Sequence, residues 1–206
     1  MHIPDQDIEL LRQAIDLATG PAGPAGIAGS ANRDMNALAA LGRPRCYARN
    51  EFFLRQGEQA HWFAFVIEGA FREFYADKDG REYNKVFNLP MDFTGSYYDL
   101  HSGNPSTVSI EALTDSRVLI FQQQAFQQMA KSDRGWLWVD YQNRLRLLRR
   151  KQEKETQLLT LDPLDRYAKL CEQFPTVHEL VADYHIASYL GITPSSFSRL
   201  KRMRGK

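Results

Sequence analysis

The last twenty residues contain side chains that can bind a polyanion. Arg199, Lys201 and Arg202 lie close together there, no Asp or Glu interrupts them, and Ser195 and Ser196 precede them. Hydroxyls and helix N-terminal amides bind phosphate oxygens, an arginine can donate two hydrogen bonds to guanine, and further cations neutralise phosphates. These residue types favour a contact with double-stranded DNA. A solvated basic surface remains the alternative.

Two short helices are predicted to position these side chains. Gly191 is suited to end the first helix, and Thr193 can cap a second helix that has Pro194 in its first position. Phe197 and Leu200 then share an inward face. This layout fits a helix-turn-helix unit, whose second helix enters the major groove. The residues predicted to contact DNA are Thr193, Ser195, Ser196, Ser198, Arg199, Lys201 and Arg202.

The charge distribution supports a polyanionic partner. The chain has a formal net charge of +1. From Arg144 to Lys206 there are 13 Lys and Arg against 7 Asp and Glu, whereas the remainder has 13 against 18. A basic last third on an acidic body is typical of a chain that binds nucleic acid.

The histidines and cysteines do not indicate an enzyme or a metal site. His61 and His101 are forty residues apart, and His178 and His185 are seven apart, where a zinc-binding helix needs a spacing of four. We therefore expect surface or capping histidines, no metal, no cofactor and no catalytic residues. The two cysteines form no CxxC pair, so no disulfide is predicted.

The segment from Cys46 to about Phe121 has the pattern of a β-domain. Aromatic and β-branched clusters alternate with turn signals, which predicts a compact barrel or jelly-roll-like β-roll. Asp79-Gly80 predicts a tight hairpin. The string "DKDG" also resembles part of a calcium loop, but the later ligands are missing.

A long helix is predicted to follow this β-domain. Asp133 can cap its start. A heptad-like seam predicts pairing with a second copy of the chain, and packing against the chain's own β-domain is the alternative. The seam consists of Trp138, Tyr141, Leu145, Leu148, Gln152, Glu155 and Leu159.

These patterns give an α+β fold in four parts. We assign residues 1–30 to an N-terminal helix and a flexible Gly/Pro-rich linker, 31–130 to an effector-sensing β-roll, 131–159 to a dimerisation helix and 160–206 to a small DNA-binding domain. No apolar run is long enough to span a bilayer and no signal peptide is evident, so a cytoplasmic protein without a membrane partner is expected.

The order of these parts resembles the CRP/FNR family of bacterial transcription regulators. The similarity extends from about Asn32 to the end of the chain and is carried by strings such as "DFTGSYYDLHSGNPSTVSIEAL" and "IASYLGITPSSFSRLKR". The resemblance implies a homodimer on palindromic DNA, an effector in the β-roll, and Arg199 as the base-reading arginine. RNA polymerase is a further partner that it allows.

Several positions depart from the family pattern. Cyclic-AMP binders have Gly-Glu and Arg-Ser where this chain has Gly95-Ser96 and Ser106-Thr107. A charge-assisted hydrogen bond is worth about 1.5–3 kcal/mol, so poor cyclic-nucleotide binding is predicted. The pocket either takes an uncharged or aromatic ligand or is filled by neighbours such as Tyr97 and Tyr98. The family's Arg-Glu at the start of the reading helix is Pro-Ser here, and its C-terminal β-hairpin is missing, so a different operator is expected.

The sequence therefore predicts a DNA-binding transcription regulator of the CRP/FNR type with a divergent effector pocket. The alternative is a ligand-sensing module that acts through a protein partner. The sequence identifies neither the effector, the operator nor the direction of regulation.

Overall fold

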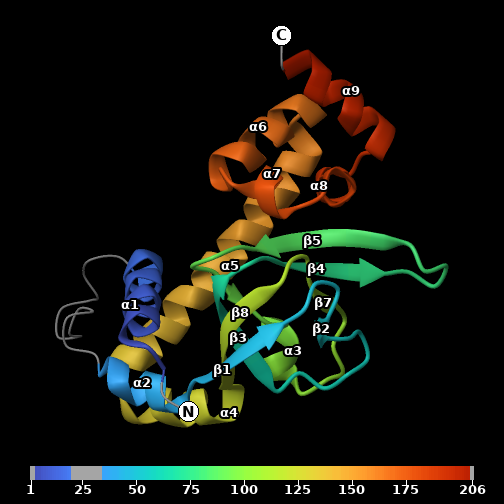
Figure 1. The fold of residues 1–206 in the computed structure, drawn as a ribbon. Helices are drawn as coiled ribbons and strands as arrows, with labels where there is room; N and C mark the ends of the chain where they lie inside the picture. Colours follow the sequence, from blue (N-terminus) through green and yellow to red (C-terminus); the bar gives the residue numbers. More distant parts are fainter. Residues whose placement is uncertain (1–2, 20–33, 205–206) are drawn as a thin grey trace.

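The strands lie in two antiparallel sheets that together form a β-roll (Figure 1). The computed structural model describes residues 3–19 and 34–204 of the chain. One sheet has the strand order β1-β8-β3-β6 and the other β2-β7-β4-β5. The strands are β1 (Arg43–Tyr47), β2 (Phe52–Leu54), β3 (Trp62–Glu68), β4 (Phe71–Ala76), β5 (Glu82–Asn88), β6 (Phe93–Thr94), β7 (Ser109–Ala112) and β8 (Ser116–Gln122).

Strand β3 shows how the period-two alternation of side chains separates two hydrophobic clusters. Ala64 and Val66 point into one cluster with residues of both sheets, such as Phe71 and Ile110. Phe65 belongs to another cluster, which the roll shares with the surrounding helices. The first sheet is thus covered on both faces, and this explains why the sequence of strand β3 is nearly continuously hydrophobic.

Strands β4 and β5 form the predicted hairpin. Their register runs from Phe71 opposite Asn88 to Ala76 opposite Glu82. Gly80 has a φ of 77° in the connection, a conformation that glycine adopts without steric cost. Asp77 holds the turn by accepting from the amides of Asp79 and Arg81, so this acidic string shapes a turn.

The N-terminal helix α1 (Asp5–Thr19) is integrated into the roll's helical cover. Leu11 and Ile15 are fully buried in the cluster shared with α2 (Met35–Leu41) and the first sheet. The side chain of Asp7 is paired with Arg117 of β8 at 2.5 Å. The Gly/Pro/Ala-rich segment predicted as a linker lies, after Thr19, outside the described residues.

The long helix α5 (Arg134–Thr160) follows α4 (Gln123–Ser132) and runs from the roll to the C-terminal helices (Figure 1). Asp133 caps it as predicted, accepting from the amide of Gly135 at 2.7 Å. Trp136 and Val139 are buried against the roll. On another side of the helix an apolar stripe is exposed in this single chain: Leu137, Tyr141, Leu145, Leu148 and Leu159.

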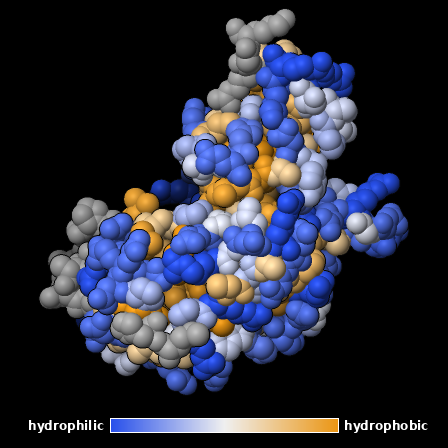
Figure 2. Space-filling model, in the orientation of Figure 1, coloured by the Kyte–Doolittle hydropathy of each residue, from blue (hydrophilic) through white to orange (hydrophobic). Residues whose placement is uncertain are grey.

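In the described part of the chain, four further helices follow: α6 (Pro163–Gln173), α7 (Val177–Leu180), α8 (Asp183–Leu190) and α9 (Pro194–Arg204). Figure 2 shows this C-terminal unit projecting from the larger body, with hydrophilic residues over its outer end, where Figure 1 places α9. The predicted fold class is confirmed: a β-roll, a long helix and a small helical C-terminal unit. Among the described residues, no helix is both long and apolar enough to cross a membrane.

Candidate functional site

The helices α8 and α9 form the predicted helix-turn-helix geometry. Gly191 ends α8 with a φ of 70°, and Thr193 caps α9 by accepting from the amide of Ser196 at 3.2 Å. Phe197 and Leu200 are buried, 1% and 8% exposed, in the hydrophobic cluster of the C-terminal unit. The inward face of α9 is thereby fixed, and the opposite face is left to solvent.

The outward face of α9 contains most of the residues predicted to bind DNA. Ser196 is half-buried and bonded to Thr193, so both hydroxyls are partly used by the cap. Lys201 donates to the carboxylate of Asp183 at 2.8 Å, which ties α9 to the start of α8. The exposed members of the predicted set are Thr193, Ser195, Ser198, Arg199, Lys201 and Arg202. Of the arginines, Arg199 and Arg202 make no hydrogen bond or ion pair to any described residue.

Helix α8 packs on strand β5, and Asn84 of that strand makes several of the contacts. Its backbone amide donates to Ser188 at 3.0 Å, its side-chain amide donates to the carbonyl of His185 at 2.9 Å, and Arg72 donates to its side-chain oxygen at 3.3 Å. His185 is 6% exposed. The expectation of a surface or capping role was therefore wrong for His185. Asn84, which contacts both the ring and the carbonyl of His185, belongs to a strand about one hundred residues earlier in the chain.

Electrostatics at this junction favour neutral groups. Burial, and then the positive charges of Arg72 and Arg49, lower the pKa of His185 to about 4. Lys154 of α5 donates to the carbonyls of Asn84 and Lys85 at 2.9 and 2.7 Å. Burial, and then the charge of Lys85, lower the pKa of Lys154 to about 7. The C-terminal unit thus contacts the roll through desolvated, hydrogen-bonded groups.

The residues predicted to form the effector pocket separate into two groups. Ser96 and Thr107 donate to one carboxylate, that of Asp99 in helix α3 (Tyr97–Ser102). The hydroxyl of Ser106 lies 3.3 Å from the same carboxylate and 2.9 Å from the carbonyl of Val108, its closer acceptor. Asp99 was not singled out from the sequence. Its position three residues after Ser96, within one helical turn, is the signal that was available.

The other predicted pocket residues lie elsewhere. Gly95 and Tyr97 line a cavity of about 60 Å³ between the roll and the helices α1, α2, α4 and α5. Tyr98 is 75% exposed and does not fill any pocket.

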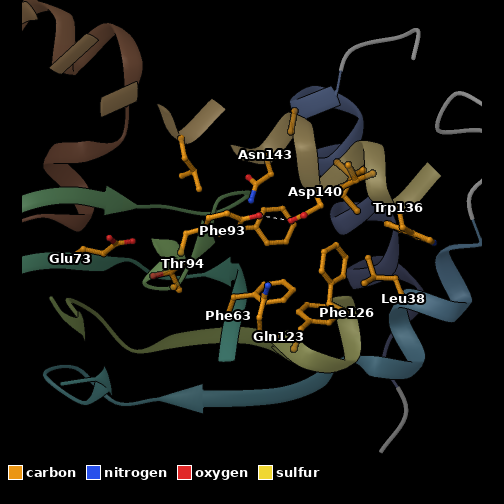
Figure 3. Close-up of a pocket in the computed structure, with 17 residues that line it drawn as sticks. Leu38, Phe63, Glu73, Phe93, Thr94, Gln123, Phe126, Trp136, Asp140 and Asn143 are labelled. Atoms are coloured by element: carbon orange, nitrogen blue, oxygen red, sulfur yellow. Dashed lines mark hydrogen bonds between the residues drawn. The ribbon is translucent and has the colours of Figure 1, made fainter. Parts of the chain in front are cut away.

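The cavity is predominantly apolar. Leu38, Phe126 and Trp136 lie toward one end and Glu73 and Thr94 toward the other (Figure 3). Tyr97 donates to Asp140 of α5, and burial followed by this hydrogen bond raises the pKa of Tyr97. None of the described residues that line the cavity is a Lys, Arg or His. The lining suits a small uncharged molecule and offers an anion no counter-charge.

No metal-binding cluster is found among the described residues, meaning a group of three or more His, Cys, Asp and Glu side chains. His101 interacts with the carbonyl of Tyr97 and with Gln123 and Arg144. His178 is within 2.7 Å of the hydroxyl of Tyr167. These histidines have structural partners of their own.

Comparisons with known proteins agree with this architecture. Residues 44–133 match the family model of the cyclic nucleotide-binding domain. No curated protein sequence matches the chain. The β-roll is thus similar to a cyclic nucleotide-binding domain, and the fold of most of the chain is similar to that of solved CRP/FNR-type regulators.

Three solved structures illustrate the fold similarity. FixK2 from Bradyrhizobium japonicum is 21% identical with a TM-score of 0.65, covering 79% of this chain and 83% of that one. CLP, a c-di-GMP responsive global regulator of Xanthomonas campestris, is 19% identical with a TM-score of 0.64, covering 83% and 90%. A CooA mutant from Carboxydothermus hydrogenoformans is 18% identical with a TM-score of 0.64, covering 83% and 78%. Identities this low are evidence of a shared fold.

Proposed function

We propose that this chain is a DNA-binding transcription regulator that acts as a homodimer. The observation that carries the proposal is the outward face of α9, where Arg199 and Arg202 are exposed and unpaired among the described residues while Phe197 and Leu200 anchor the helix. Such a helix presents hydroxyls at its start and guanidinium groups further along, which is the order that phosphate positioning and base reading require.

The exposed stripe of α5 supports the homodimer. Leu137, Tyr141, Leu145 and Leu148 are each more than 40% exposed in one chain and follow one another at intervals of three and four. An apolar seam on a helix of 27 residues suits pairing with the same seam of a second copy. Two copies would then present two α9 helices to the two halves of a palindromic site.

An uncharged small molecule suits the effector domain better than a cyclic nucleotide. The cavity beside α5 has no cationic lining, and Thr107, in the loop before β7, has its donors directed to Asp99. A cyclic phosphate would enter a site without an arginine partner and would lose its hydration without compensation. Because Tyr97 links the cavity to Asp140 of α5, a ligand there would act on the proposed dimerisation helix.

The test of DNA binding is selection from a random duplex pool, followed by sequencing and by affinity measurements at two salt concentrations. The proposal predicts enrichment of an inverted repeat and binding that weakens steeply with salt, because released counterions drive phosphate contacts. Recovery of no enriched sequence by a folded protein would contradict it.

The dimer is tested separately by sedimentation. Leu148→Asp places a charge on the exposed stripe and is expected to give monomers with weaker binding to the inverted repeat. Glu153→Lys, an exposed charge change on another side of α5, is the matched control and should leave the dimer intact. Equal behaviour of the two variants would argue against pairing through this stripe.

A further inference from the structure

Strand β5 lies at the edge of its sheet, and the rest of the chain covers this edge at Asn84. The backbone groups on the outer side of an edge strand have no neighbouring strand to pair with. Here the amide of Asn84 donates to the hydroxyl of Ser188 in α8 at 3.0 Å, and its carbonyl accepts from Lys154 of α5 at 2.9 Å. Figure 1 shows α8 beside β5. The roll, the long helix and the C-terminal unit therefore meet at one residue.

The side chain of Asn84 is also fully hydrogen-bonded. Its Nδ2 donates to the carbonyl of His185 at 2.9 Å and lies 3.3 Å from the ring atom Nδ1 of the same residue. Its Oδ1 accepts from Arg72 of β4 at 3.3 Å. Asn84 is only 5% exposed, and both its backbone groups and both its side-chain atoms have partners. Any change in the position of α8 on the roll would leave some of these buried groups unpaired.

Arg72 determines the direction of these hydrogen bonds. An arginine can only donate, so the oxygen of the Asn84 side chain must face Arg72 and the nitrogen must face His185. The Nδ1 atom of His185 is then an acceptor without a proton. Burial, and then the positive charges of Arg72 and Arg49, lower the pKa of His185 to about 4, which agrees with a neutral ring.

The guanidinium of Arg72 is itself fixed in the sheet. Arg72 is 5% exposed and pairs with Glu111 of β7 at 2.5 Å and with Glu82 of β5 at 2.6 Å. Its guanidinium carbon lies 3.9 Å from the centre of the Phe74 ring. A guanidinium with two carboxylate partners and an aromatic neighbour has little freedom to rotate. The sheet therefore fixes the orientation of the Asn84 amide, and that amide fixes the position of α8.

Helix α9 is connected to α8 closely enough to follow its position. The turn between the two helices is short, and Lys201 of α9 donates to Asp183 of α8 at 2.8 Å. Phe197 of α9 belongs to the same buried cluster as Ile186 and Leu190 of α8. A change in the angle of α8 on β5 would therefore change the direction of the outward face of α9. In a dimer it would change the separation of two such faces.

We propose that Asn84 is a positioning residue for DNA binding, which fixes α8 on the roll so that α9 keeps one orientation in the dimer. The inference rests on the proposed DNA-binding function and deepens it. Asn84 is buried in a strand of the roll and acts through α8. A duplex with two half-sites requires two α9 helices at a set separation, whereas one half-site requires only one. Loss of the Asn84 side chain should therefore affect the first kind of duplex and spare the second.

The experiment compares the native full chain with Asn84→Ala by fluorescence anisotropy. The duplexes contain one half-site, two half-sites at the selected spacing, or two half-sites with added base pairs between them. Because two buried hydrogen bonds are lost, we expect about tenfold weaker binding at the selected spacing and an affinity for one half-site within about twofold of native. The penalty for added base pairs should become smaller, because a less restricted unit can reach more than one spacing.

Leu170→Ala is the control for a simple loss of stability. Leu170 of α6 is 2% exposed, so its truncation destabilises the C-terminal unit while the contacts of Asn84 remain. This variant should melt at a lower temperature and keep the native preference for spacing. The proposal would be overturned by equal losses of Asn84→Ala on one and two half-sites, or by an unchanged spacing preference in that variant. A preference relaxed equally by Leu170→Ala would assign the effect to stability and would also overturn it.

Ser188→Ala provides the decision if Asn84→Ala does not fold. It removes only the hydroxyl that accepts from the backbone amide of Asn84. We expect the same pattern as for Asn84→Ala with a smaller loss at the selected spacing. A spacing preference identical to that of the native chain would overturn the proposal.

A measurement without DNA separates this proposal from the DNA-binding function. Electron–electron double resonance reports the distance between a spin label on the exposed Cys46 of the roll and a label on Ser198→Cys of α9. The background is Cys171→Ser, and the labelled protein is diluted with unlabelled chains. Asn84→Ala should give a broader distance distribution than the native side chain. Equal widths would overturn the positioning role. A broader distribution in a chain that binds no duplex would support Asn84 as the residue that orients α9 and would refute only the DNA-binding function.

Discussion

The two helices of the C-terminal hairpin are adjacent in sequence but have opposite surroundings. Helix α8 is closed against the roll: His185 is 6% exposed, and Ile186 and Ala187 are fully buried. Helix α9 is buried only along the side of Phe197 and Leu200, and its other sides are open to solvent (Figure 1).

The difference shows how one hairpin separates packing on the roll, through α8, from the DNA contact that we propose for α9. The groups of α8 that contact the roll are neutral and hydrogen-bonded, so removing them from water has only a small cost in free energy. Arg199 and Arg202 of α9 are exposed and make no ion pair with any described residue, so they are available to a polyanion. Docking through α8 therefore fixes the orientation of α9 without using its charged face.

The largest effect expected for this comparison is the loss of stability of the contact between α8 and the roll as the pH falls. His185 has a folded pKa of about 4 against about 6.5 when unfolded, so the unfolded chain binds a proton first as the pH falls. The contribution of neutral, buried His185 to the free energy of unfolding is complete above pH 6.5, declines below it and is lost at about pH 4. The total loss is at most about 3 kcal/mol. Hydrogen exchange of α8 across this range should show the loss. His185→Gln, which cannot be protonated, should flatten the response. An equally steep response in this variant would assign it to other groups.

The next effect in size is the loss of DNA discrimination expected when a cation on the solvent-exposed face of α9 is removed. Arg199→Ala should cost about 1–3 kcal/mol of discrimination between the selected operator and a scrambled duplex, because a bidentate base contact is lost. Lys201→Ala is the matched neighbour: its ammonium is already held by Asp183 at 2.8 Å, so a smaller and sequence-independent loss is expected. Fluorescence anisotropy with both duplexes measures the two losses. Comparable losses of discrimination would remove the distinction between the two cations.

The smallest effect concerns the cap between the two helices. Thr193→Ala removes the oxygen that accepts from the amide of Ser196 and should destabilise the C-terminal unit by about 1 kcal/mol. Ser198→Ala, an exposed change one turn later, should be nearly neutral. Thermal unfolding of both variants tests the difference. A destabilisation by Ser198→Ala as large as that by Thr193→Ala would mean that the cap has no special role.

The sequence predicted those features that depend on local chemistry. Gly191 and Thr193 define the turn because their conformational and hydrogen-bonding preferences act within a few residues. Asp133 caps α5 for the same reason, and Gly80 supplies the positive φ of the hairpin. These signals, together with strand periodicity, were sufficient for the order of the main parts: a β-roll, a long helix and a C-terminal pair of helices.

Features that depend on distant partners were not predictable in this way. Asn84 of β5 donates to the carbonyl of the buried His185, and Lys201 is paired because Asp183 lies across the hairpin. The role of Asp99 was missed because its donor Thr107 meets it only when the loop folds back over α3. Residue spacing alone does not contain these contacts.

The connection between α5 and α6 has a consequence for the proposed DNA site. Only Leu161 and Asp162 separate the two helices, and both are held, Leu161 through its amide to Gln157 and Asp162 through the amides of Leu164 and Asp165. Such a short, hydrogen-bonded connection restricts rotation of α6 relative to α5. In a dimer formed through α5, the two α9 helices would therefore be held at a fixed separation, so inserted or deleted base pairs between the two half-sites should be poorly tolerated.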